Sequence, residues 1–202
     1  PAYAASPSGE LHATAYYYKL LTPDGSPLVE ASRLVFRGFQ GESDYPLLLE
    51  INRSSHRADN DEVNISLDDI AYTLSHMERL DPERDILIAS LKGLPEAVGY
   101  SRLGWYSSSA DTRLYYQVSF LRQECRGNGV WEAIIRQNEN RLREIAAGHP
   151  GIPHQFFQAW TSDKEADWVS ALENTGYRLV RRFHNMIYRL GEAPDIAMLD
   201  GF

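Results

Sequence analysis

The chain has 202 residues, 43% hydrophobic and 24% charged, proportions that are typical of one soluble globular domain. Its net charge of −8 disfavours nucleic acid as a partner, because such a surface repels phosphate backbones. The same negative charge either mildly favours a cationic substrate or only keeps the protein soluble. The single cysteine excludes an intrachain disulfide. No apolar run is long enough to span a bilayer, and no secretion signal is evident at the N-terminus. We therefore expect a cytoplasmic protein that binds neither a membrane nor nucleic acid.

The first third of the chain predicts two strands followed by a helix. Residues 1–32 are expected to be an N-terminal extension with one strand, in the aromatic-rich run at residues 11–21. A second strand is expected at residues 33–39, and Pro46 marks the first turn of a helix. Residues 53–64 are polar and without periodicity, so we expect a loop there.

The middle of the chain predicts a capped helix and then three strands. Ser66 can cap a helix whose apolar residues recur at helical spacing, and Pro82 closes it. Strands are expected at residues 85–91, 97–106 and 113–121. Because the turns between them are short, the three strands should form antiparallel hairpins.

The last third predicts two helices that alternate with strands. A long helix should run to about Ala147, followed by a short strand at residues 155–160. The pattern from Ser162 to Glu165 is that of a capping box, which would open a helix ending at Gly176. Two extended runs follow at residues 177–190, and residues 191–202 are expected to be a linker or tail.

This order of elements predicts a mixed α/β fold. One parallel crossover, between residues 113–121 and 155–160, would lie inside an otherwise antiparallel sheet flanked by about four helices. The predicted organisation is one domain at residues 33–190, with an extra N-terminal strand before it.

The turn after the third strand of the middle group carries the main chemical signal. In Arg126-Gly-Asn-Gly-Val-Trp131, a strand has just ended and a helix begins at once. Such a turn exposes backbone N–H groups at the positive end of a helix, which suits a phosphate, and glycines allow it a close approach. A turn of this kind also occurs purely as a connection.

The same turn resembles the pyrophosphate motif R/Q-x-x-G-x-G/A of the GNAT family of N-acetyltransferases. Ala133-Ile-Ile135 is similar to the start of that family's following helix, and residues 168–177 are similar to the end of its fourth helix. The likeness covers about residues 33–190 in the right element order. Residues 80–85 and 139–145 also look like tandem-domain GNAT proteins of the mycothiol-synthase kind.

This resemblance implies that the protein moves an acetyl group from acetyl-CoA to a small-molecule or peptide amine by direct attack, without a metal. It implies that backbone groups of Ser119, Phe120 and Leu121 pair with the pantetheine arm. It also implies that N–H groups of one loop hold the pyrophosphate, namely those of Arg126, Gly127, Asn128, Gly129, Val130 and Trp131. The general base and the general acid remain unassigned.

Several residues depart from the family pattern. Trp131 stands where the family prefers Gly or Ala; it would either crowd the diphosphate or pack inward on the helix. Gln123 replaces a common proline, a milder change. Leu172 stands where many members carry the tyrosine that protonates the thiolate. Other tyrosines could substitute in space or simply pack in the core: Tyr100, Tyr115, Tyr116 and Tyr177.

No catalytic base is evident on the predicted central strand, which lacks carboxylates and histidines. Glu50 and His184 are conceivable bases, although each is more often a surface or satisfied polar residue. Cys125 is expected to be inert, because no paired histidine activates it. The sequence thus supports two hypotheses: an active acetyltransferase, or a catalytically degenerate half that binds the cofactor or serves as a structural or regulatory part.

Two short segments resemble each other near the two ends of the chain. Tyr16-Tyr-Tyr-Lys-Leu20 is similar to Met186-Ile-Tyr-Arg-Leu190, and each is followed by a linker containing Pro and Asp. Either a second GNAT domain belongs to the same polypeptide, or the first segment is only an N-terminal strand extension. A homodimer is the other partner that we consider.

Overall fold

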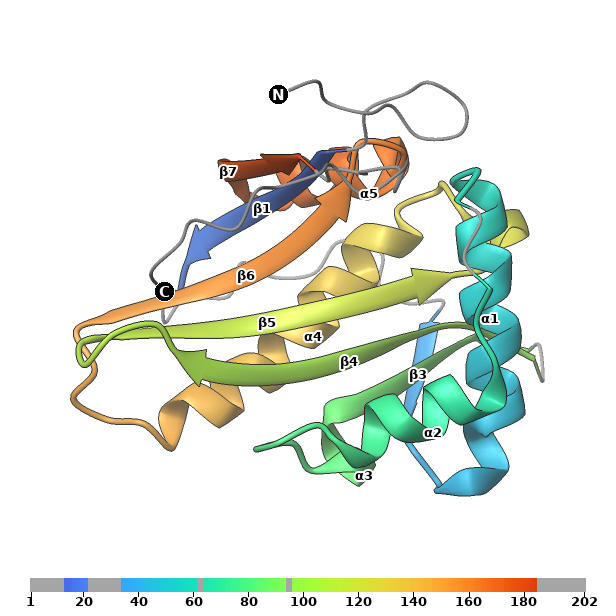
Figure 1. Ribbon diagram of the computed structural model, residues 1–202, viewed down its shortest axis with the longest axis horizontal. Helices are drawn as coiled ribbons and strands as arrows, with labels where there is room; N and C mark the ends of the chain where they lie inside the picture. Colours follow the sequence, from blue (N-terminus) through green and yellow to red (C-terminus); the bar gives the residue numbers. More distant parts are fainter. Residues whose placement is uncertain (1–12, 22–33, 62–63, 94–95, 185–202) are drawn as a thin grey trace, which may run out of the picture.

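The computed structural model describes residues 13–21, 34–61, 64–93 and 96–184 (Figure 1). Seven strands form one sheet in the order β2-β3-β4-β5-β6-β1-β7. The strands are β1 (Ala13–Leu20), β2 (Leu34–Gly38), β3 (Ile86–Leu91), β4 (Ala97–Ser107), β5 (Thr112–Leu121), β6 (His154–Ser162) and β7 (Arg178–His184). Neighbouring strands are antiparallel except β5 and β6, which are parallel. The predicted mixed α/β sheet with one parallel crossover is therefore confirmed.

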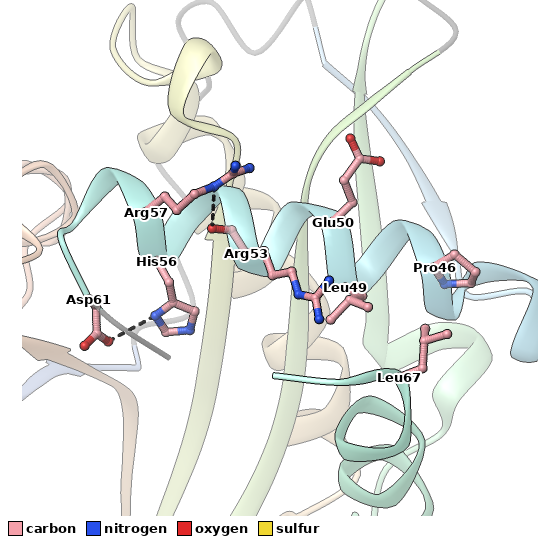
Figure 2. A pocket seen from close by; sticks show the side chains of 8 residues that line it. All are labelled: Pro46, Leu49, Glu50, Arg53, His56, Arg57, Asp61 and Leu67. Carbon is pink, nitrogen blue, oxygen red and sulfur yellow. Dashed lines mark hydrogen bonds and ion pairs between the residues drawn. The ribbon is translucent and has the colours of Figure 1, made fainter. Parts of the chain in front are cut away.

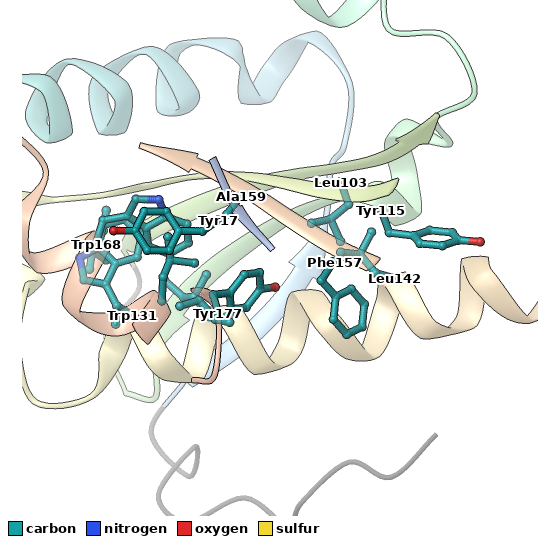
Figure 3. Packing of buried hydrophobic residues seen from close by; sticks show 14 of the residues in the cluster. Tyr17, Leu103, Tyr115, Trp131, Leu142, Phe157, Ala159, Trp168 and Tyr177 are labelled. Carbon is teal, nitrogen blue, oxygen red and sulfur yellow. The ribbon is translucent and has the colours of Figure 1, made fainter. Parts of the chain in front are cut away.

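Helices cover both faces of the sheet (Figure 1). Those in the described residues are α1 (Tyr45–Ala58), α2 (Leu67–Ser75), α3 (Pro82–Asp85), α4 (Val130–Ala147) and α5 (Ala166–Asn174). The core is divided accordingly: α1 and α2 pack over one cluster that includes Ile88 and Tyr100, and α4 and α5 pack over a larger one that includes Phe157 and Tyr177 (Figure 3). No helix in the described ranges combines the length and the apolar character needed to cross a membrane.

The expected loop at residues 53–64 is wrong in its first half, because α1 continues to Ala58. Apolar periodicity fails there since the buried face of the helix is polar. Asn52, Ser54 and Ser55 are all buried. Asn52 donates to Tyr100 Oη at 3.3 Å, and Ser54 Oγ accepts the Gln123 N–H at 3.2 Å. The inner face of α1 is thus used for hydrogen bonds to the sheet and to the loop that precedes α4.

Two predicted helix boundaries have different outcomes. Ser66 caps α2 as expected, in a reciprocal capping box with Asp69. The helix nevertheless ends at Ser75, and Pro82 opens the short α3 instead of closing α2. At α5 the predicted cap is wrong: Glu165 is the N-cap, and Ser162, which ends β6, donates its N–H to the Glu165 carboxylate at 2.5 Å.

The N-terminal strand β1 is an internal strand of the sheet, paired with β6 on one side and β7 on the other. Lys19 on β1 fastens it to two helices. Its ammonium group contacts both carboxylate oxygens of Glu139 on α4, at 2.8 and 3.0 Å, and the Thr175 carbonyl after α5 at 2.9 Å. Glu139 is only 3% exposed and also accepts from Arg143 at 3.0 Å, the i,i+4 pair that the sequence predicts.

Replacing Lys19 with methionine should lower the unfolding free energy by about 1–3 kcal/mol, because the buried Glu139 carboxylate then keeps only one cationic partner. Urea denaturation measures the change. Lys92→Met at an exposed position is the matched control and should leave the stability unchanged. Equal stability of the two variants would contradict a structural role for the β1 lysine.

Candidate functional site

The sheet opens between β5 and β6. Their parallel pairing begins at Thr112 and His154 and ends at Gln117 and Ala159. Strand β5 nevertheless continues to Leu121 and β6 continues to Ser162, so the two strands diverge over their last residues (Figure 1). A wedge-shaped gap in one layer of the sheet is the result.

The β6 side of this gap has partners of its own. In the register of β6 with β1, the backbone N–H and C=O groups of Trp160 and Ser162 point toward β5. The Trp160 carbonyl accepts from the Trp168 indole N–H at 3.2 Å, and the Ser162 N–H donates to the Glu165 carboxylate. Side chains at α5 and its N-cap thus replace the sheet hydrogen bonds that β6 lacks.

The β5 side of the gap remains open to a ligand. The Arg122 N–H donates to Val98 O on β4 at 2.8 Å, so alternation along the strand turns the backbone groups of Ser119 and Leu121 toward the gap. Phe120 turns its backbone toward β4 and places its ring at the gap instead. Two of the three residues expected to pair with pantetheine therefore present backbone groups to this space.

A cavity of about 310 Å³ occupies the gap. Strand residues of β5 and β6 line it together with Arg102 from β4, His56 from α1, and Glu165 and Trp168 from α5 and its N-cap. Under it, Asn138 on α4 is fully buried and donates from its amide to Gln117 Oε1 at 2.8 Å and to Ser119 Oγ at 3.1 Å. The Ser119 side chain is thus held from below, and its backbone stays at the gap.

The predicted phosphate loop has the geometry of an anion cradle. Gly127, Asn128 and Gly129 all have positive φ angles, of 90°, 51° and 74°. A Cβ added at Gly127 or Gly129 would meet nothing within 4 Å, so the space before the loop is open. Helix α4 starts at Val130, so its positive dipole end lies at this loop. Two of the N–H groups that the resemblance assigns to the pyrophosphate already have partners, because Arg126 donates to Gln123 O at 3.3 Å and Val130 donates to Gly127 O at 3.1 Å.

The Arg126 side chain has its partners within the protein. Its guanidinium forms two hydrogen bonds with Asp59 at the end of α1, at 2.5 and 2.7 Å, and another with the Ser55 carbonyl at 3.1 Å. The side chains of Arg126 and Asp59 are only 12% and 6% exposed. Arg126 therefore joins the C-terminus of α1 to the loop, and its charge is already balanced before any phosphate binds.

Trp131 packs inward, one of the two alternatives that the sequence leaves open. It is 4% exposed, and its ring lies 4.8 Å from that of Trp168 (Figure 3). Leu172, at the position of the family tyrosine, is completely buried in the same cluster. Tyr177 Oη accepts from Gln117 and Tyr115 Oη contacts His149, so these hydroxyls have partners in the core.

Glu50 and Cys125, which were also considered for catalysis, do not line the cavity in the gap. Glu50 accepts from Arg122 at 2.7 Å on the outer side of α1. The side chain of His184 lies outside the described residues. Burial raises the pKa of the Cys125 thiol, which disfavours the reactive thiolate.

Sequence reasoning missed two titratable groups that line the gap, His56 and Glu165. His56 was assigned to a loop, and Glu165 to a capping box. The Asp61 carboxylate lies 3.1 Å from His56 Nδ1, and the imidazole lies 5.8 Å from the Phe120 ring. Burial raises the pKa of Glu165, and repulsion from Asp59 adds to the shift, against the lowering effect of the Ser162 N–H.

A second cavity, of about 540 Å³, lies on the outer face of α1 (Figure 2). It is lined along the helix by Pro46, Leu49, Glu50, Arg53, His56 and Arg57, and from beyond the helix by Asp61 and Leu67. His56 lines both cavities.

Several solved structures share this fold at low sequence identity. A GCN5-related N-acetyltransferase from Sphaerobacter thermophilus matches with a TM-score of 0.56 and 13% identity, over 86% of this chain and 50% of that one. A putative GNAT-family acetyltransferase from Novosphingobium aromaticivorans matches with a TM-score of 0.52 and 11% identity, over 87% of this chain and 63% of that one. A predicted acetyltransferase from Clostridium acetobutylicum, solved with acetyl-CoA, has a TM-score of 0.50 and 16% identity, over 72% and 90% of the two chains.

These likenesses show that the chain has the fold of GNAT acetyltransferases, as the resemblance in the sequence implies. No protein-family model and no curated protein matches the sequence. The chain spans half the length of the Sphaerobacter protein and less than two thirds of the Novosphingobium protein.

Replacing Arg126 with methionine should destabilise the fold by about 3–5 kcal/mol, because Asp59 keeps a buried charge without its partner. The double variant Arg126→Met/Asp59→Asn should lose less than Arg126→Met alone, since no buried charge remains. Urea denaturation of both variants and of Asp59→Asn completes the cycle. Additive losses would show that the two side chains do not act as a pair.

Replacing Glu165 with glutamine should change how stability depends on pH. Because burial raises the pKa of Glu165 in the folded state, the folded protein binds that proton more tightly than the unfolded chain. This group therefore adds stability as the pH falls from neutral toward its ordinary value of 4.5. Glu165→Gln should be more stable than the wild type near pH 7.5, with the difference shrinking toward pH 5. A difference that is constant with pH, measured by urea denaturation, would contradict this.

Proposed function

We propose that this chain is an acyl-CoA-dependent N-acetyltransferase domain that moves an acetyl group from acetyl-CoA to an amine. The observation that carries the proposal is the gap between β5 and β6. In this gap, Ser119 and Leu121 offer backbone groups to an extended ligand. The open loop at Gly127 and Gly129 follows in the chain after the end of β5. The low-identity likenesses support the fold and are consistent with this chemistry.

The residues of the gap fit the shape and polarity of the proposed co-substrate. Ser119 and Leu121 would pair with the amides of the pantetheine arm, and the Phe120 ring would form one wall. Of the amides at this loop, those of Gly127, Asn128, Gly129 and Trp131 would hold the diphosphate, because the Arg126 and Val130 N–H groups have partners in the protein. Because Arg126 is paired with Asp59, backbone amides and the helix dipole would carry most of this binding.

Acetyl-CoA would supply the activated acetyl thioester. The task of the chain is then to hold an amine beside the gap, to remove a proton from it and to keep water away. His56 is placed for the proton transfer, since Asp61 fixes one ring nitrogen and the ring lies at the wall of the gap. No tyrosine at position 172 is needed for this step.

The second candidate is a catalytically degenerate half of a tandem protein of the mycothiol-synthase kind. Leu172 in place of the family tyrosine favours it, as does the charge balance at Arg126. The half-length match to the Sphaerobacter protein is consistent with a further domain in the same polypeptide. In either form we place the domain in the cytoplasm, where acetyl-CoA is available.

Calorimetry with acetyl-CoA and with acetyl-pantetheine tests the proposed function. Acetyl-CoA should bind in the micromolar range, and the truncated ligand should bind about tenfold more weakly or worse, because it lacks the diphosphate that the loop would hold. Thiol release in the presence of amines then separates an active enzyme from a degenerate half. Absence of binding at millimolar acetyl-CoA would leave only a structural role for the domain.

A further inference from the structure

We propose that the cavity on the outer face of α1 receives the acceptor, and that the acceptor is a primary amine that also carries a carboxylate and an apolar side chain. This inference rests on the proposed function and narrows its substrate class. It is carried by the charges and by the apolar residues that line the cavity shown in Figure 2.

Both acidic side chains of this cavity already have a hydrogen-bond partner. Glu50 is bound by Arg122 at 2.7 Å, and Asp61 lies 3.1 Å from His56 Nδ1. The two arginines are different. Arg53 donates from Nε and Nη2 to the Ile65 carbonyl at 3.1 and 2.6 Å, and Arg57 donates from Nε to the Arg53 carbonyl at 3.3 Å.

These contacts orient both guanidinium groups without neutralising them. Within the described residues, neither arginine forms an ion pair with a carboxylate. A cavity with two oriented guanidinium groups that form no ion pair among the described residues attracts an anion, and a carboxylate matches the fork of N–H groups on a guanidinium. This local charge is opposite to the net charge of −8 of the whole chain.

The apolar part of the cavity limits the rest of the ligand. Pro46, Leu49 and Leu67 line it, and Leu67 is 44% exposed although it opens a helix beside this space. An aliphatic or aromatic group of the ligand would cover these side chains. The ligand that satisfies both parts has the size and composition of an apolar amino acid.

His56 lines both this cavity and the gap between β5 and β6. Arg53 and His56 are three residues apart on α1 and thus neighbours on the helix surface, about 5–6 Å apart at Cβ. A carboxylate held by an arginine therefore leaves the amine of the same small molecule close to the imidazole. When Asp61 accepts a hydrogen bond from Nδ1–H, the lone pair of Nε2 can accept a proton from the ammonium group.

The reaction balances with these groups. His56 Nε2 takes one proton from the ammonium group and passes it to solvent. The free amine forms a bond to the acetyl carbon while the C–S bond breaks and the thiolate leaves with the electron pair. The nitrogen then loses its second surplus proton, which the thiolate takes up.

Titration of the protein alone, without acetyl-CoA, tests the carboxylate site. The probes are L-leucine and L-leucinamide, which differ only in the carboxylate, and binding is followed by NMR. L-leucine should bind about tenfold more tightly. Net charge favours the cationic amide, so this preference has to arise in the cavity. Equal binding of the two ligands would overturn the proposal.

Arg57→Met should lower the affinity for L-leucine about tenfold and leave that for L-leucinamide unchanged. Arg84→Met, at an exposed arginine in α3, is the matched control and should bind both ligands as the wild type does. An Arg57→Met variant that keeps the preference for L-leucine would overturn the assignment of this arginine to the carboxylate.

Steady-state kinetics with L-leucine test His56. The His56→Gln variant should lose about 100-fold in kcat, because the proton acceptor is absent, while it keeps the L-leucine affinity measured by NMR. An unchanged kcat would overturn the role of the imidazole. If acetyl-CoA binds and L-leucine does not, this inference fails and the proposed function stands. If L-leucine binds and acetyl-CoA does not, the proposed function fails, although the carboxylate site survives.

Discussion

Strands β5 and β6 separate after Gln117 and Ala159. The rest of the structure depends on this separation. Asn138 anchors β5 to α4 just where the pairing ends, and Trp168 and Glu165 supply β6 with the hydrogen bonds that it would otherwise take from β5. The separation therefore leaves no buried polar group of Trp160 or Ser162 facing the gap without a partner. Only the β5 edge is left for a ligand, which fixes the direction in which an extended molecule can add to the sheet.

The C-terminal end of α1 is where the two cavities and the phosphate loop come together. Arg126 ties this end to the loop through Asp59 and Ser55, while His56 in the same turn faces both cavities. A rigid helix end thus positions a titratable ring relative to the loop and the strands. The ion pair that removes Arg126 from phosphate binding is the same one that holds this arrangement together.

The sequence predicted the order of elements and the parallel crossover, because apolar spacing and turn residues encode them directly, whereas it left open whether Trp131 packs inward. The prediction from the sequence was wrong at residues 53–58. Because α1 buries serines there that bond to residues of the 122–126 loop, this stretch lacks the apolar spacing that indicates a helix. Both His56 and the partner of Arg126 lie in or beside that stretch. The site residues that depend on contacts between α1 and a loop far along the chain could not be found from local pattern.

The position of β1 has a consequence for how the chain can fold. Tyr16 pairs with Trp160 on one side and Arg181 on the other, so the first of the described strands can pair only after the last two have been synthesised. Such distant pairings slow folding, since a long loop has to close before any contact forms. During synthesis an aromatic-rich strand therefore remains without its neighbours until almost the whole domain has left the ribosome, a period in which it is open to pairing with other chains.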